Sequence, residues 1–365
     1  MGLFASRPNR TGHPEEQRDE GSLCGLVPVL QGNDPGWYHC PVPTEKPETP
    51  RTPEAPIPEF IPPMKVTPDM PCPCGSKKLV RECCLDADGN LRVKVPSLIP
   101  IAPSTGYAHP KCYLSHTLDC SDKISAEHYV SRSILEAMGE DVEVFGLPWQ
   151  QKGTASKYGI NSLVSNILCV RHNSAMSPLD ALACQAFKTV KALSDDLSRQ
   201  SDTSAVTWHL VSGEALELWC LKTLCGLYFS TVAAKDGNSL KPAYSLDVRA
   251  FEEAIGLRRL PPNCGLYGRL VTGQFNSQIS WAPLIVDYAT RLIGLRLRMC
   301  AAEFEVFLDP FNVNFDAVRT EATFRPWNLI FSDGKRMHVV VLSWPDKPQG
   351  DRRINYGIRP TLPPL

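Results

Sequence analysis

The chain has 365 residues, with 38 Lys and Arg against 39 Asp and Glu, so its formal net charge is −1. Hydrophobic residues make up 43% of the chain and the mean hydropathy is −0.18, which suits a soluble protein with a sizeable core. This charge balance excludes a global basic field that holds nucleic acid by itself, so nucleic-acid binding requires local patches. No apolar secretory segment is visible, and Lys222 interrupts the longest apolar run. We therefore expect a cytoplasmic protein that does not contact a membrane.

The first segment, residues 1–71, is expected to be disordered. Twelve of the 33 prolines of the chain fall within 41–73. A proline-rich segment of this kind is extended and stiff, and it cannot form a core.

Four cysteines follow this segment at close spacing. They are Cys72, Cys74, Cys83 and Cys84, in the pattern Cys-x-Cys-x8-Cys-Cys. Tetrahedral zinc requires four such donors, and Gly75 suits the tight turn between the first pair and the return loop. A disulfide between adjacent cysteines would be strained, which favours a metal. The spacing predicts a zinc site.

The stretch 72–85 resembles the SEC-C motif, which occurs in the C-terminal tail of the SecA preprotein translocase and in many other proteins. Gly75 and Ser76 match the motif, whereas Lys77 replaces the glycine that often follows. The resemblance implies a structural zinc ion. It also implies a possible protein partner for the motif. All four ligands come from the protein, so no position is left for a reacting water.

A second set of candidate ligands is spread over the next hundred residues. It consists of Cys112, Cys120, Cys169 and His172. Cys-x2-His is a familiar zinc-binding pair, but the gap between Cys112 and Cys120 is unusual. His109 or His116 is therefore an alternative for one of the four ligands.

Glu127 and His128 lie between the two halves of this second set, and Asn173 follows it directly. Together these residues resemble an HNH endonuclease of the His-Me finger class, which is built on a treble-clef zinc scaffold. The resemblance covers about residues 107–197. The middle asparagine of the family pattern has no clean match, and either Asn161 or Asn166 is a candidate for it.

The resemblance implies a catalytic role for three residues. His128 would be the general base that deprotonates the attacking water, and a neutral imidazole suits this role at pH 7. Glu127 and Asn173 would hold one Mg²⁺ or Mn²⁺ ion on the phosphate. We therefore expect a metal-dependent nucleic-acid endonuclease in which the zinc ions are structural. The alternative is a non-catalytic zinc-scaffolded module that binds a protein or a nucleic acid.

The strongest helix pattern of the chain follows these residues. Ser177 is a suitable N-cap, Pro178 suits the first helical position, and apolar residues recur at helical spacing up to Leu197. The pattern predicts a helix that begins at Ser177.

The remainder, 205–365, is expected to be a separate α+β domain of unknown role. The pattern predicts a strand over 205–211, a buried helix over 213–234 and a hairpin that turns at Asp333-Gly334. His209 and His338 are interpreted as ordinary strand histidines. The whole chain is thus predicted to be α+β, with two zinc sites and a treble-clef domain between a disordered N-terminal segment and this C-terminal domain.

Overall fold

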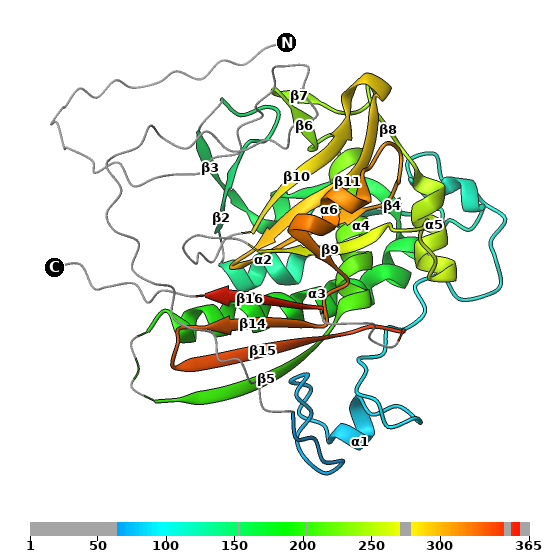
Figure 1. Ribbon diagram of the computed structural model, residues 1–365. Helices are drawn as coiled ribbons and strands as arrows, with labels where there is room; N and C mark the ends of the chain where they lie inside the picture. The colour runs from blue at the N-terminus through cyan, green and yellow to red at the C-terminus, as the bar shows by residue number, and fades with distance from the viewer. Residues whose placement is uncertain are drawn as a thin grey trace, which may run out of the picture.

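A computed structural model describes residues 64–139, 141–151, 154–199, 201, 203–270, 279–346 and 352–357. The disorder predicted for 1–71 therefore lies outside the described residues, apart from 64–71. The described residues form a mixed α+β structure, as predicted (Figure 1). Its helices are α1 (Val80–Cys83), α2 (Arg132–Met138), α3 (Val170–Leu197), α4 (Gly213–Phe229), α5 (Val248–Leu257) and α6 (Phe315–Glu321).

Two larger sheets dominate the C-terminal half. The four-stranded sheet has the order β16 (Arg353–Gly357), β14 (Asn328–Ser332), β15 (Arg336–Ser343), β5 (Ala205–Ser212). The six-stranded sheet has the order β10 (Ile279–Val286), β11 (Arg291–Met299), β12 (Ala302–Phe307), β9 (Gly265–Arg269), β13 (Ala322–Phe324), and β8 (Ser245–Leu246) pairs with β11.

Three small antiparallel pairs complete the strands. They are β1 (Ile124–His128) with β4 (Val164–Cys169), β2 (Asp141–Phe145) with β3 (Ala155–Gly159), and β6 (Ala234–Lys235) with β7 (Asn238–Ser239). In the first pair Ile124 lies opposite Cys169 and His128 lies opposite Val164. The end of β1 therefore lies beside the start of β4, and β4 leads directly into α3.

Helix α4 lies at the centre of the molecule. Every residue from Gly213 to Tyr228 is buried, because α4 packs against α3, α5 and strands of both larger sheets (Figure 1). The buried helix predicted here is confirmed. One cluster of buried hydrophobic side chains extends from Leu98 to Tyr356. The segments 107–197 and 205–356 thus share a hydrophobic core.

Helix α3 begins seven residues before the predicted start, at Val170 instead of Ser177. Its N-cap is Cys169, whose sulfur accepts from the backbone N–H of His172. Pro178 consequently lies inside the helix, where it cannot donate to the carbonyl of Ser174. The hydroxyl of Ser177 donates to that carbonyl at 2.9 Å, so the acceptor is satisfied. Ser177 supports the helix at a proline and does not begin it.

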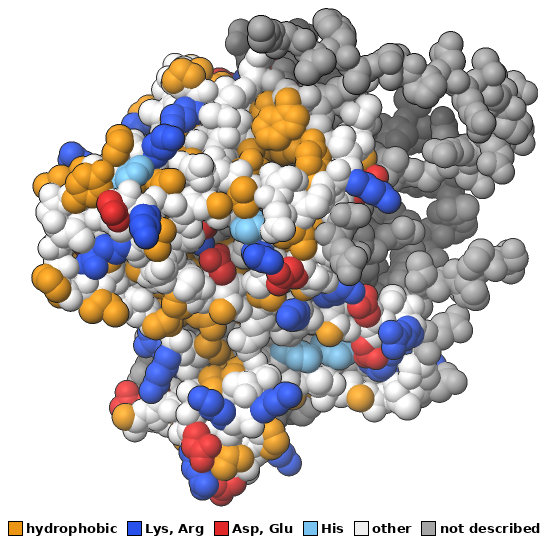
Figure 2. Space-filling model, turned by 180° about the vertical axis from the view of Figure 1, so that it is seen from behind, with side chains coloured by type: hydrophobic (Ala, Val, Ile, Leu, Met, Phe, Trp, Pro, Cys, Tyr) orange, Lys and Arg blue, Asp and Glu red, His pale blue; other side chains and the backbone are white. Residues whose placement is uncertain are grey.

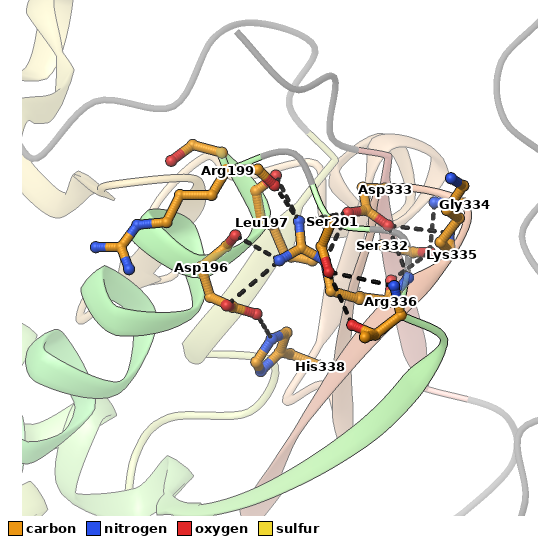
Figure 3. A network of polar contacts seen from close by, with 12 residues as sticks. Asp196, Leu197, Arg199, Ser201, Ser332, Asp333, Gly334, Lys335, Arg336 and His338 are labelled. Carbon is orange, nitrogen blue, oxygen red and sulfur yellow. Dashed lines mark hydrogen bonds and ion pairs between the residues drawn. The ribbon is translucent and has the colours of Figure 1, made fainter.

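A polar network joins the end of α3 to the hairpin of β14 and β15 (Figure 3). The buried guanidinium of Arg336 donates to the carbonyl oxygens of Asp196 at 2.8 Å and Leu197 at 3.4 Å. It also donates to the carboxylate of Asp333 at 2.7 Å. The predicted turn at Asp333-Gly334 is confirmed, and Arg336 connects it to carbonyl groups at the end of α3.

Candidate metal centres and an adjoining pocket

The four cysteines of the first cluster lie together. Their sulfur atoms are all within 4.8 Å of one another, and the group could hold a metal ion such as zinc. The backbone N–H of Gly75 donates to the carbonyl of Cys72 at 3.0 Å, which closes the tight turn between the first two ligands. Gly75 has a φ of +79°, a conformation that glycine adopts without strain. The hydroxyl of Ser76 lies 3.0 Å from the sulfur of Cys83.

The loop that carries this cluster contacts the four-stranded sheet and α3. The backbone N–H of Leu210 on β5 donates to the carbonyl of Pro73 at 3.0 Å. The side chain of Gln185 on α3 donates to the carbonyl of Cys74. A metal in this cluster would therefore hold the loop in place against the body of the protein.

The second predicted set also comes together. Cys112, Cys120, Cys169 and His172 are buried and present ligand atoms within 4.8 Å of one another. Nδ1 of His172 lies 3.1, 3.6 and 3.8 Å from the sulfur atoms of Cys169, Cys112 and Cys120 respectively. Two ligands thus come from the loop before β1, one ends β4 and one lies in the first turn of α3. Burial lowers the pKa of His172, which favours the neutral imidazole that a metal requires.

The alternative ligands left open by the sequence lie elsewhere. Nε2 of His116 is 2.6 Å from the carboxylate of Glu252 on α5. Nδ1 of His109 accepts from the backbone N–H of Lys111 at 3.2 Å. Neither histidine belongs to the group of four ligand atoms.

The three predicted catalytic residues line one pocket of about 540 Å³. Glu127 and His128 end β1, and Asn173 lies in the first turn of α3. The side-chain amide of Asn173 donates to the hydroxyl of Ser125 at 2.7 Å, and this hydrogen bond holds the Asn173 side chain against β1. The lining also includes Asp180, but it includes neither Asn161 nor Asn166. The other lining residues are Ala126, Ser131, Arg132, Ser133, Glu136, Ser174, Ser177 and Ala181.

His128 lines the pocket with an imidazole whose Nε2 atom is shielded from solvent. Its Nε2 atom is buried and has no hydrogen-bond partner among the described residues. Burial is the main cause that lowers the pKa of His128, and Arg132 lowers it further. The imidazole is therefore neutral at pH 7 and can accept a proton.

Glu127 is held by a residue that sequence reasoning did not select. Nζ of Lys222 on α4 lies 2.8 Å from Oε1 of Glu127 and 2.7 Å from Oδ2 of Asp180. Lys222 is 5% exposed and Glu127 is 7% exposed. Burial lowers the pKa of Lys222, but the carboxylates of Asp180 and Glu127 outweigh this effect and raise it. The lysine is therefore charged. The only feature of the sequence that draws attention to Lys222 is that it interrupts an apolar run.

Comparison of the chain with known proteins identifies no relative. No protein-family description, no curated protein and no solved structure matches the chain. Among the described residues, no helix is both long and apolar enough to span a bilayer. On the face of the molecule seen in Figure 2, Lys and Arg side chains are interspersed with Asp and Glu side chains.

Proposed function

We propose that the pocket hydrolyses phosphodiester bonds of nucleic acid and that both cysteine-containing centres bind structural zinc. One observation carries the proposal: Glu127, His128 and Asn173 line a single pocket directly beside the Cys112/Cys120/Cys169/His172 centre. The order of β1, β4 and α3 supports it, because a strand pair followed by a helix with a ligand in its first turn is the arrangement expected of a treble clef. The resemblance to HNH endonucleases rests on the same residues.

In this proposal His128 is the general base. Nε2 of His128 is buried, so the proposal requires that substrate binding opens a path to it; a water then transfers its proton to Nε2 and attacks the phosphorus atom. Asn173 orients the substrate from the start of α3, since its side chain is fixed by Ser125. The scissile P–O bond then breaks, and the leaving oxygen takes up a proton from solvent, which leaves a phosphate on one product and a hydroxyl on the other.

The residues around Glu127 do not fit the Mg²⁺ or Mn²⁺ ion that the resemblance implies. The ammonium group of Lys222 lies at hydrogen-bond distance from Glu127, at the place where a divalent ion would need that carboxylate. A positive ion beside an ammonium group is repelled, because like charges at a few ångströms interact unfavourably in a buried site. We therefore assign no step of the reaction to a divalent ion.

Plasmid nicking tests the proposal. Zinc-loaded protein should nick supercoiled DNA or cleave single-stranded RNA, and His128→Ala should lose this activity while its zinc content is unchanged. His116→Ala is the matched control, because His116 pairs with Glu252 and does not line the pocket. The proposal is wrong if the wild-type protein cleaves neither substrate, with or without added Mg²⁺ or Mn²⁺.

A second function is favoured by the contact between Lys222 and Glu127. An acidic side chain that is neutralised and buried is also what a non-catalytic zinc-scaffolded module would contain. Such a module would bind a protein or nucleic-acid partner, and the 72–85 loop is the candidate contact for a protein. Binding of nucleic acid that is unaffected by His128→Ala, without cleavage, is the outcome this second function expects.

A further inference from the structure

We propose that Lys222, which lies behind the pocket lining against Glu127 and Asp180, takes the place of a divalent metal ion at Glu127. A role of Lys222 in catalysis rests on the proposed function. The expected absence of a divalent ion at Glu127 does not rest on it. The protein should therefore bind no Mg²⁺ or Mn²⁺ in this pocket, and removal of the lysine side chain should create a divalent site from its two carboxylate partners.

The geometry places two carboxylates around one point. Oε1 of Glu127 and Oδ2 of Asp180 lie 2.8 and 2.7 Å from the same Nζ atom. Divalent ions such as Mg²⁺ and Ca²⁺ bind carboxylate oxygens at about 2.0–2.6 Å, so a small inward shift of both groups would suit a metal at this point. The donor set is that of a metal site, and the ammonium group occupies its centre.

Lys222 is held at this point by surrounding contacts. Its partner Asp180 accepts from the hydroxyl of Ser131 at 2.5 Å, and that hydroxyl accepts from the indole N–H of Trp219 at 2.7 Å. Lys222 and Trp219 both belong to α4, which is buried along its length. The helix therefore supplies the ammonium group and also orients the carboxylate that binds it.

Displacement of the ammonium group by a metal is unfavourable for a specific reason. Lys222 is buried, so water cannot solvate its ammonium group if a metal ion displaces it from Glu127 and Asp180. A buried charge without a partner costs several kcal/mol. Binding of a divalent ion to the same two carboxylates would have to release more free energy than this cost.

Mn²⁺ binding to zinc-loaded protein tests the inference. In an electron paramagnetic resonance titration, wild-type protein should show no pocket site up to about 1 mM Mn²⁺, the weak end of carboxylate sites. Lys222→Met should gain one Mn²⁺ site, at least about tenfold tighter than any wild-type site, because two paired carboxylates become free to coordinate. Its melting temperature should rise on addition of Mn²⁺ or Mg²⁺, whereas that of the wild type should not.

The double variant Lys222→Met/Glu127→Gln is the matched control. It lacks one carboxylate and should lose the Mn²⁺ site that the single variant gains. If Lys222→Met does not fold, the wild-type protein and its Glu127→Gln variant decide the inference. A Mn²⁺ site that is present in the wild type and lost in Glu127→Gln overturns the inference. A wild-type protein without such a Mn²⁺ site supports it. A folded Lys222→Met protein that binds no Mn²⁺ also overturns it.

Cleavage assays separate this inference from the proposed function. Cleavage by wild-type protein in buffer freed of divalent ions supports both. Cleavage that requires Mg²⁺ or Mn²⁺ supports the nuclease function but contradicts the role of Lys222. Absence of cleavage in all conditions contradicts the function alone, and the Mn²⁺ titration still decides the role of the lysine.

Discussion

The hydroxyl oxygen of Thr117 lies 3.2 Å from Nε2 of His172. The same hydroxyl donates its own proton to the carbonyl of Leu114 at 2.8 Å, so it accepts from Nε2–H of the histidine. This hydrogen bond places the histidine proton on Nε2 and leaves Nδ1 free, and Nδ1 is the atom that faces the three cysteine sulfur atoms. If a metal binds this group, Thr117 would orient one of its ligands without contacting the metal.

Thr117→Val should weaken zinc binding at the centre that contains His172. Loss of such a supporting hydrogen bond typically lowers metal affinity by about 10- to 100-fold. Competition with a zinc chelator measures the effect, and Thr117→Ser, which keeps the hydroxyl, should retain near wild-type affinity. Equal affinities for the valine and serine variants would show that the hydroxyl does not orient His172.

Each of the two centres should hold one zinc ion. Cys83→Ser removes a thiolate from the first centre only, so it should lower the zinc content by about one ion per chain and leave the second centre filled. Mass spectrometry of metals in the purified protein measures the content. Cys184→Ala is the control, because this buried cysteine on α3 belongs to neither centre. A Cys83→Ser protein with an unchanged zinc content would contradict the four-cysteine site.

Arg336→Ala should destabilise the fold strongly. The change leaves Asp333 and the carbonyl groups at the end of α3 without their buried donor (Figure 3). Removal of one partner of a buried ion pair costs about 3–5 kcal/mol of unfolding free energy. Urea unfolding measures the change.

Lys191→Ala provides the comparison for Arg336→Ala. Lys191 pairs with Asp195 on the exposed side of the same helix, and such a pair contributes only about 0.3–0.5 kcal/mol. Similar losses in the two variants would show that Arg336 does not stabilise the helix end.

Stability should fall as the pH is lowered toward 4, partly because of His209. Burial, together with the adjacent His338, lowers the pKa of His209 from 6.5 to about 4. Nε2 of His209 lies 3.0 Å from Nδ1 of His338, so the two rings are in direct contact inside the sheet. Between these two pKa values the unfolded chain binds a proton that the folded protein does not bind. The contribution of His209 to the free energy of unfolding is therefore complete above about pH 6.5 and is lost as the pH falls through 4.

His209→Gln should reduce this pH dependence. Urea unfolding at pH 7 and at pH 5 measures it, and the loss of unfolding free energy between the two values should be smaller in the variant than in the wild type. If both proteins lose the same amount, the histidine pair does not contribute to the acid sensitivity.

Some of the fold followed from local patterns. The buried helix α4 and the hairpin at Asp333-Gly334 were predictable because apolar runs and turn residues act over short distances. The start of α3 was not, because Cys169 is an unusual N-cap and Ser177-Pro178 is a typical helix start. The pairing of His209 with His338 was also hidden, since it depends on β5 lying parallel to β15 from the far end of the chain.

The sequence by itself determined which residues can bind metal. The four cysteines within 72–84 are so close in sequence that one short loop can bring them together. The Cys169-x2-His172 pair places two candidate ligands within one helical turn. Only the tertiary structure decided what surrounds Glu127 on β1, because Lys222 approaches from α4 and its second partner Asp180 lies on α3. A buried charge is stabilised by partners that the folded chain brings together, and their distance along the sequence carries no information about that contact.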